Sequence, residues 1–512
     1  MISRSPLFLG IDLGTSLLKL QAIDQTGRSV AEASVSLDLS IPQPGWAEQS
    51  PAHWWDACIW ACQSLFASGA LKPEQVAAIG FSGQMHGAVF LDAEGEVLRP
   101  CLIWADGRTV EQVAQIETRI PRTELIGITG NAANTSFTAA KVLWVRQHEP
   151  EIYARTRQIL LPKDYLRFRL TGHLASDVSD ASATLLFDLA TRDWSPTLLH
   201  ALGIDAGLLP PVYESTAIAG KISVEAARAT GLVAGTPVVA GGGDAECSAF
   251  GLGLASGQDR TLLCSIGTSA QVFAVTDRPV IDLSGRIHSL CHVVPGRWHV
   301  MGAILAGGVS LRWLRDLLTP PDADRLPTYT TLTAEAAQAG VGASGLTFLP
   351  YLLGERTPYM DPHARGVFFG LRLDHGRAHM ICAVMEGVVL ALRDGLEVFR
   401  ELGVVSAEVR AVGGGAQSEL WLQIQRDIFN LPIRRSLTDH GAAYGAALLA
   451  GLGAGAFATP EDAVAGMPLA EPSPPDPAVV AQYQRIYERY RALYPALREQ
   501  FARADVNIAD SR

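Results

Sequence analysis

A short glycine-containing turn near the start of the chain carries residue types that suit phosphate chemistry. Asp12, Gly14, Thr15 and Ser16 follow an apolar run, and Lys19 comes shortly after them. Backbone N–H groups in such a turn can hold phosphate oxygens, and the hydroxyls and the ammonium add donors. Asp12 is placed to hold Mg²⁺ through water, since Mg²⁺ keeps much of its hydration shell. The competing interpretation is an ordinary hairpin turn.

The same pattern recurs near the middle of the chain. Gly267, Thr268 and Ser269 lie between the apolar runs 260–265 and 271–275. Two strand–turn–strand units that share Gly-Thr-Ser favour the phosphate interpretation and suggest an internal duplication. The alternative, that two unrelated hairpins share a turn, stays open at this point.

A third glycine-rich turn ends in a carboxylate. Asp244 follows Gly241, Gly242 and Gly243 after the apolar run 233–240. Glycine lets a ligand approach the backbone closely, and an Asp in this place could accept a proton from a substrate hydroxyl. It could equally cap the helix that follows, and the two roles are compatible.

Two clusters of polar and aromatic residues suit the recognition of sugar hydroxyls. Met85 and His86 follow an apolar strand-like segment, and Trp104, Asp106 and Arg108 stand together further on. An aromatic ring, an acceptor and a donor are a common combination in sugar sites. The alternatives are a structural histidine for the first cluster and a surface turn with a local ion pair for the second.

Alternating apolar runs and turn residues predict an α/β chain that must position these groups. No complete Walker A or dinucleotide-binding motif is present. We place the domain boundary after the third turn, which gives domains 1–245 and 246–512. Strands are predicted at 17–23, 77–81, 233–240, 260–265, 271–275 and 406–412, and helices at 53–66, 111–120 and 418–429.

The composition describes a globular, acidic chain. Its 512 residues predict two or three domains. Lys plus Arg number 41 and Asp plus Glu 52, a net charge of −11, which argues against nucleic acid or an anionic membrane as a partner. The 7 Cys predict reduced thiols in a cytoplasmic protein. Segment 441–458 is rich in Gly and Ala and predicts a close-packed helix, not a membrane span.

The order of the motifs along the chain resembles the FGGY family of carbohydrate kinases, and most closely its xylulokinases. The resemblance covers nearly the whole chain, and segments 136–148 and 366–386 are similar to the two family signatures. The other matching segments are 10–16, 45–49, 83–87, 161–165 and 354–358.

This resemblance implies two ribonuclease H-like α/β domains of the actin/hexokinase/sugar-kinase superfamily around a central cleft. It implies transfer of the γ-phosphoryl group of ATP, with Mg²⁺, to a sugar hydroxyl. Asp244 matches the catalytic base and Asp12 the Mg²⁺-linked acid, so both are predicted at the metal. The two Gly-Thr-Ser turns match phosphate hairpins. The adenosine motif is matched by Gly413, Gly414, Gly415, Ala416 and Gln417.

For the acceptor, the resemblance implies D-xylulose, bound by Met85 and His86 and converted to D-xylulose 5-phosphate. Ala105 and Ala245 stand where xylulokinases usually carry Asn. No extra basic cluster accompanies the sugar residues in the sequence, so a sugar acid would lack an obvious partner. The alternatives are a kinase for another ketose, polyol or sugar acid, and a catalytically weak sugar-binding regulatory protein. The assembly state is open, with a homodimer as one option.

Overall fold

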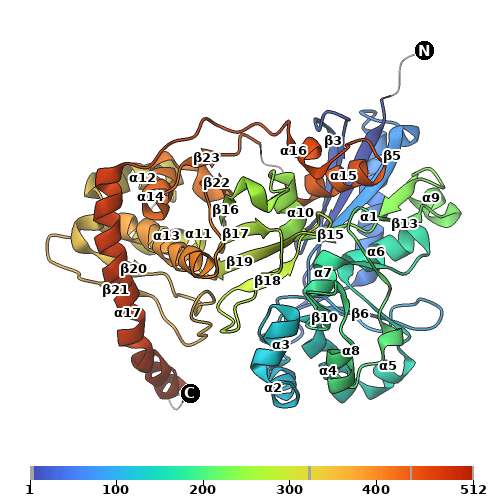
Figure 1. Ribbon diagram of the computed structural model, residues 1–512, viewed down its shortest axis with the longest axis horizontal. Helices are drawn as coiled ribbons and strands as arrows, with labels where there is room; N and C mark the ends of the chain where they lie inside the picture. The colour runs from blue at the N-terminus through green and yellow to red at the C-terminus, as the bar shows by residue number, and fades with distance from the viewer. Residues whose placement is uncertain (1–4, 321–324, 439–440, 510–512) are drawn as a thin grey trace.

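Two mixed β-sheets organise the chain, one in each of two lobes (Figure 1). The computed structural model describes residues 5–320, 325–438 and 441–509. The first sheet has the order β13-β14-β5-β1-β2-β3, with β15 beside β5. Its strands are β1 (Leu7–Leu13), β2 (Leu17–Ile23), β3 (Ser29–Ser36), β5 (Val76–Gly83), β13 (Ile218–Lys221), β14 (Pro237–Val239) and β15 (Gly242–Gly243).

The second sheet repeats the arrangement of the first. In both, three strands form an antiparallel meander, and two further strands run parallel to the first on its other side. The order is β18-β19-β17-β16-β22-β23. This equivalence confirms the predicted duplication and fold class. The strands are β16 (Thr261–Ile266), β17 (Ala270–Thr276), β18 (His288–Cys291), β19 (Trp298–Ile304), β22 (Glu408–Val412) and β23 (Ile433–Arg435).

Most predicted elements are confirmed within a few residues, but the strand predicted over 233–240 is shorter. It begins only at Pro237, because Gly235 has a positive φ of 88° and turns the chain before it. Gly241, with a φ of 84°, then separates β14 from β15. Left-handed backbone of this kind interrupts a strand, and glycine adopts it at little cost.

Helices cover both sheets and fill the space beyond them. On the first sheet lie α1 (Pro51–Ala67) and α6 (Pro162–Thr171), and on the second lies the long α13 (Arg377–Glu401). The C-terminal helix α17 (Pro477–Ala509) runs along the second lobe (Figure 1). Its Tyr487 hydroxyl donates to Asp394 of α13 at 2.7 Å. Further helices are α4 (Thr138–His148), α7 (Val178–Ser182), α10 (Asp244–Gly251), α11 (Gly308–Leu318), α12 (Tyr329–Ala336) and α14 (Glu419–Phe429).

Helix α15 (Ala442–Gly453) lies on the first sheet although it comes late in the chain (Figure 1). Glycines allow this close contact between helix and strands. A Cβ at Gly10 of β1 would lie 1.8 Å from the Ala443 carbonyl oxygen, and one at Gly80 of β5 would lie 2.0 Å from that of Ala446. Helix α15 belongs to 246–512 in the sequence but packs in the lobe that is built mainly from 1–245. The domain boundary at 245/246 therefore stays a prediction.

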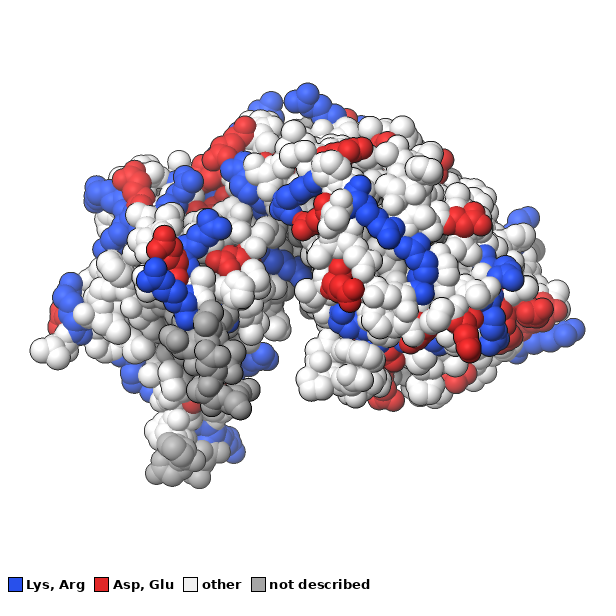
Figure 2. All heavy atoms as spheres, turned by 90° about the horizontal axis from the view of Figure 1, so that it is seen from below, with Lys and Arg blue, Asp and Glu red and all other residues white. Residues whose placement is uncertain are grey.

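A hollow separates the two lobes when the molecule is seen from below (Figure 2). Basic and acidic side chains are interspersed over this face instead of forming a patch of one sign. Within the described residues, no helix combines the length and the apolar character that crossing a membrane requires.

Candidate functional site

An acidic pair lies at one edge of the first sheet. Asp12 is near the end of β1 and is the register partner of Ser82 in β5. Ser82 is in turn the register partner of Gly242 in β15, two residues before Asp244 at the start of α10. Because these strands run parallel, their carboxyl ends meet at the same edge and bring the two carboxyl groups together.

Burial perturbs the pKa of both carboxyl groups, and the charge of Asp12 adds to the effect at Asp244. Burial raises the pKa of Asp244 to about 7, and the nearby Asp12 charge raises it further. Burial also raises the pKa of Asp12 to about 6, while the Ser82 hydroxyl and Lys19 oppose that shift. Among the described residues, none hydrogen-bonds Oδ1 of Asp12, which is buried. An unpartnered carboxylate oxygen with a second carboxyl group nearby fits a hard divalent cation such as Mg²⁺.

The first Gly-Thr-Ser turn lies beside this pair. The Gly14 N–H donates to the Leu17 carbonyl at 2.9 Å and closes the turn. The indole N–H of the partly exposed Trp104 donates to the Thr15 hydroxyl at 2.8 Å, and Ser16 is exposed. The sequence analysis predicted Trp104 beside the sugar. The structure shows that it contacts the first Gly-Thr-Ser turn.

Three polar residues of the predicted site are paired with protein groups. The Lys19 ammonium contacts the Glu32 carboxylate at 2.9 Å. Arg108 binds Asp106 through two nitrogens and also contacts Glu48 at 2.9 Å. The Asp106 side chain is fully buried, so the local ion pair exists but is not on the surface. Contact of Lys19 with phosphate, and of Asp106 and Arg108 with a sugar, stay predictions.

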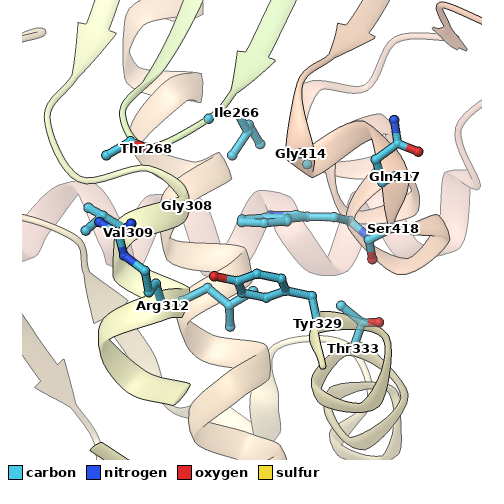
Figure 3. Close-up of a pocket in the computed structure, with 14 residues that line it drawn as sticks. Ile266, Thr268, Gly308, Val309, Arg312, Tyr329, Thr333, Gly414, Gln417 and Ser418 are labelled. Carbon is cyan, nitrogen blue, oxygen red and sulfur yellow. The ribbon is translucent and has the colours of Figure 1, made fainter. Parts of the chain in front are cut away.

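A cavity of about 320 Å³ lies in the second lobe, next to the second Gly-Thr-Ser turn (Figure 3). Gly267 and Thr268 line it, whereas the Ser269 carbonyl accepts the Gly267 N–H at 2.9 Å and holds the turn closed. The Thr268 carbonyl accepts the Val309 N–H at 3.1 Å, which attaches the turn to α11.

The glycine run after β22 forms another wall of this cavity. Gly413 has a φ of 76°, and a Cβ at Gly415 would lie 2.6 Å from the Ile266 Cβ. Larger residues would therefore displace this run from β16. Gly414, Gly415 and Gln417 line the cavity, while Ala416 is buried beneath it.

Three residues of this cavity were missed by the sequence analysis. Arg312 of α11, Tyr329 of α12 and Trp421 of α14 are the largest of the lining side chains that the sequence did not indicate, and Ile266, Gly308, Val309, Leu311, Thr333 and Ser418 line the cavity as well. Figure 3 shows Tyr329 and Arg312 extending into the space opposite Ile266 and Gly414. Of these three, only Trp421 had a signal in the sequence, because it lies in the first turn of the helix that follows the glycine run.

A smaller cavity of about 50 Å³ lies where the two lobes meet. Met85 and His86 line it together with Ala245, the residue after Asp244. The structure therefore places these predicted segments at one cavity, whose remaining lining residues the sequence did not indicate. These are Asn134, Ser136, Phe137, Glu246, His288, Leu290, Met301 and Arg356.

His86 presents a hydrogen-bond acceptor to this smaller cavity. Its backbone has a φ of 68°, and Nδ1 lies 2.7 Å from the Ala183 carbonyl oxygen. Burial lowers the pKa of His86 to about 3, so the ring is neutral. Because a carbonyl oxygen only accepts, Nδ1 carries the proton and Nε2 has the free lone pair.

A buried network holds the backbone next to Asp244. The Gly243 N–H donates to the Ser179 hydroxyl at 3.0 Å, and that hydroxyl donates to Asp177 at 2.6 Å. Lys163 contacts Asp177 at 2.8 Å and Asp180 at 3.3 Å. Every ion-pairing side chain in this network is fully buried. The network therefore fixes the turn that carries Asp244.

Two sheets that share the same core arrangement of a three-strand meander and two parallel strands, with an acidic pair and two Gly-Thr-Ser turns, define the two-domain α/β sugar-kinase fold. The family model for the N-terminal domain of the FGGY family of carbohydrate kinases matches residues 7–251, and that for the C-terminal domain matches residues 262–454. The chain belongs to this family.

Curated relatives and solved structures agree with this assignment over nearly the full length. The chain is 41% identical to a xylulose kinase of Escherichia coli, covering 96% of this chain and 99% of the relative. It is 37% identical to a xylulose kinase of Bacillus subtilis, covering 95% and 96%. The structure of a xylulose kinase from Rhodospirillum rubrum is 31% identical, with a TM-score of 0.91, covering 97% of this chain and all of that one.

Proposed function

We propose that the protein transfers the γ-phosphoryl group of ATP to D-xylulose and forms D-xylulose 5-phosphate. The observation that carries the proposal is the cavity between the lobes, in which Met85 and His86 meet Ala245, next to Asp244. The names of the full-length relatives support the choice of sugar. The thioether suits the carbon chain, and the neutral imidazole suits a hydroxyl.

In the proposed reaction, Asp244 takes the proton from the attacking sugar hydroxyl. A base with a pKa near the working pH is well suited to this step. The backbone N–H groups of the two Gly-Thr-Ser turns orient the phosphate oxygens. Asp12 and Asp244 would hold Mg²⁺, which supplies neutralisation of the phosphate charge. Closure of the lobes excludes water that would otherwise consume ATP.

The larger cavity is the proposed nucleotide site. Its apolar lining includes the rings of Tyr329 and Trp421, which suit the faces of a purine. The glycine run 413–415 gives the adenosine room to approach the backbone. All lining residues of this cavity come from 246–512, whereas Met85 and His86 come from 1–245. This distribution supports 246–512 as the nucleotide side of the chain, while the smaller cavity draws residues from both 1–245 and 246–512.

The same proposal covers the setting in which the protein acts. All seven cysteines are free and buried, which supports a reducing, cytoplasmic environment. We expect small molecules, not nucleic acid or membranes, as its partners. A homodimer stays an open prediction.

The folded chain places a basic residue at the acceptor cavity that is distant from Met85 and His86 in the sequence. No basic residue adjoins Met85 and His86 in the chain, which disfavoured a sugar acid. The folded chain brings Arg356 into the same cavity from the other lobe. A positive charge therefore faces the acceptor, and the choice between a ketose and a sugar acid requires measurement.

The first expected result is a preference for D-xylulose over glycerol, D-gluconate and L-ribulose in kcat/KM. Polar sites reject substrates that leave their groups unpaired, often by roughly 10⁴-fold, so glycerol should be the poorest acceptor. An assay coupled to ADP release measures each rate. Another acceptor that exceeds D-xylulose by about tenfold, or roughly 1.4 kcal/mol, would refute the choice of sugar. Binding without turnover of any sugar would favour a regulatory protein.

The second expected result concerns Asp12. Asp12→Asn removes a charged oxygen ligand, so the Mg²⁺ concentration for half-maximal rate should rise by roughly tenfold or more. The rate is titrated against Mg²⁺ for wild type, Asp12→Asn and the control Asp38→Asn, which changes an exposed carboxylate near the same hairpin. Coinciding Mg²⁺ curves for wild type and Asp12→Asn would return Asp12 to the role of an ordinary turn residue.

A further inference from the structure

The guanidinium of Arg356 faces the smaller cavity with its donors unused. Arg356 follows β20 (Thr347–Leu349) in the second lobe, and its backbone N–H donates to Glu355 at 2.7 Å. Across the described part of the chain, no ion pair or hydrogen bond engages its side chain. A guanidinium carries five N–H donors and no acceptor. Such a group at a cavity between two lobes is available to a ligand.

The histidines around this cavity offer acceptors instead. His288 Nδ1 lies 2.9 Å from Oδ1 of Asn131, whose amide donates to two backbone carbonyls. The Asn131 oxygen is therefore the acceptor, and His288 Nδ1 carries the proton. Burial lowers the pKa of His288 to about 4, with Arg356 adding to the effect. His288 is neutral like His86, and each exposes a free lone pair on Nε2.

Glu246 does not neutralise the guanidinium. Its side chain is fully buried, and within the described chain neither carboxyl oxygen has a hydrogen bond. Among the described residues, the Glu246 carboxyl group forms no ion pair with Arg356. The ionisable group that contacts the Glu246 carboxyl is His299, whose Nε2 lies 3.4 Å from Oε1 of Glu246. Arg356 is thus the one lining residue that carries a positive charge.

This pattern of donors and acceptors matches an open-chain ketose better than a polyol. A carbonyl oxygen only accepts hydrogen bonds, whereas each hydroxyl can also donate one. We propose that Arg356 donates to the carbonyl oxygen of the ketose while Nε2 of His86 and of His288 accept from hydroxyls. Arg356 is then a specificity-determining residue that selects the ketose over the alcohol obtained by reducing its carbonyl. This inference rests on the proposed function and adds the residue that recognises the carbonyl oxygen of the sugar.

The assignment also ties the sugar to both lobes. His86 belongs to the first lobe and Arg356 to the second, and both line one cavity. A ketose bound between them connects the two halves directly. A polyol places a hydroxyl there, which can accept from the guanidinium only if its own proton is directed to another acceptor, so the match to the guanidinium is poorer.

The test compares Arg356→Ala and Arg356→Lys with wild type on D-xylulose and D-arabitol, which differ only at the carbonyl carbon. Arg356→Ala should lose roughly 10²-fold in kcat/KM for D-xylulose, as expected for a charge-assisted hydrogen bond, and less than about threefold for D-arabitol. Arg356→Lys should lie between, because it keeps the charge but not the planar fork. The KM for ATP should stay within about twofold of wild type.

Arg372→Ala serves as the matched control, since Arg372 is an exposed arginine of the same lobe. It should behave as wild type on both acceptors. An equal loss on D-xylulose and D-arabitol in the Arg356 variants would assign Arg356 a structural role and overturn the inference. No loss on either would overturn it too. Where Arg356→Ala fails to fold by circular dichroism, the ratio of the two rates in Arg356→Lys decides.

Failure of the proposed function has a separate signature. If wild type prefers D-gluconate and Arg356→Ala loses that preference, the guanidinium holds a carboxylate, and both proposals fall. If wild type prefers D-xylulose but Arg356→Ala keeps the wild-type ratio of D-xylulose to D-arabitol, only the carbonyl assignment falls. A selective loss on D-xylulose supports both.

Discussion

Asp244→Asn is expected to lower kcat by roughly 10²–10⁴-fold while sugar and nucleotide still bind. An amide has nearly the shape of the carboxylate but cannot take the hydroxyl proton, and a general base contributes a factor of this size. Single-turnover assays give the rate, and calorimetric titrations with D-xylulose and with ATP report binding. Asp259→Asn changes an exposed carboxylate beyond α10 and is the control. Turnover near that of wild type in folded Asp244→Asn would refute the assignment of the base.

The pH dependence gives an independent reading of Asp244. Its pKa is raised to about 7, so the ionised base becomes scarcer below that pH and kcat/KM should fall on the acid side. A bound cation would move this fall in kcat/KM to lower pH, because it favours the ionised form of Asp244. The same shift means that the contribution of Asp244 to the stability of the free protein falls as pH rises from about 4 through 7. We therefore expect Asp244→Asn, without Mg²⁺ or ligands, to melt at a higher temperature than wild type at pH 8.

Lys163→Met is expected to destabilise the first lobe by about 3–5 kcal/mol. Lys163 contacts Asp164 at 2.6 Å, Asp177 at 2.8 Å and Asp180 at 3.3 Å, and all four side chains are fully buried. Arg167 is the other cation of the cluster and contacts Asp164 at 3.0 Å. Removing Lys163 leaves three buried carboxyl groups beside one guanidinium, and the desolvation of those charges is no longer compensated.

Thermal melting and soluble yield measure this effect, with Lys221→Met as the control because Lys221 is an exposed lysine of the same lobe. The control should change stability by less than about 0.5 kcal/mol. The strain should also reach Asp244, since Asp177 holds the Ser179 hydroxyl that accepts the Gly243 N–H. Equal melting temperatures for Lys163→Met and wild type would show that the cluster relaxes or admits water.

The local patterns of the chain determined a large part of the site. The Gly-Thr-Ser turns and the glycine run before Asp244 could be identified without tertiary information, because a glycine in a tight turn is a local requirement of the backbone. The strands on either side were equally clear, since their apolar runs are short and bounded by turn residues. Where a glycine interrupts an apolar run, as Gly235 does, the predicted strand came out too long.

Local sequence patterns could not predict which distant polar groups pair with one another. Arg108 and Asp106 are close in sequence, but their burial depends on Trp46 and Glu48, which lie about sixty residues earlier in the chain. An aromatic and ionic cluster of this kind forms only when separate segments pack together. The same sequence in an exposed turn would have left both side chains free to contact a sugar.

The sequence alone determined the class of chemistry, because the turns, the two acidic residues and their order along the chain are properties of short segments. Only the tertiary structure decided which groups share a cavity. Packing of the two sheets brings Arg356 within reach of His86, 270 residues away in the chain, and places Tyr329 across from Gly414. It also decides the charge of each group, since burial, not residue type, raises the pKa of Asp244 and keeps His86 and His288 neutral. Those features arise from the exclusion of water between lobes, which no local pattern encodes.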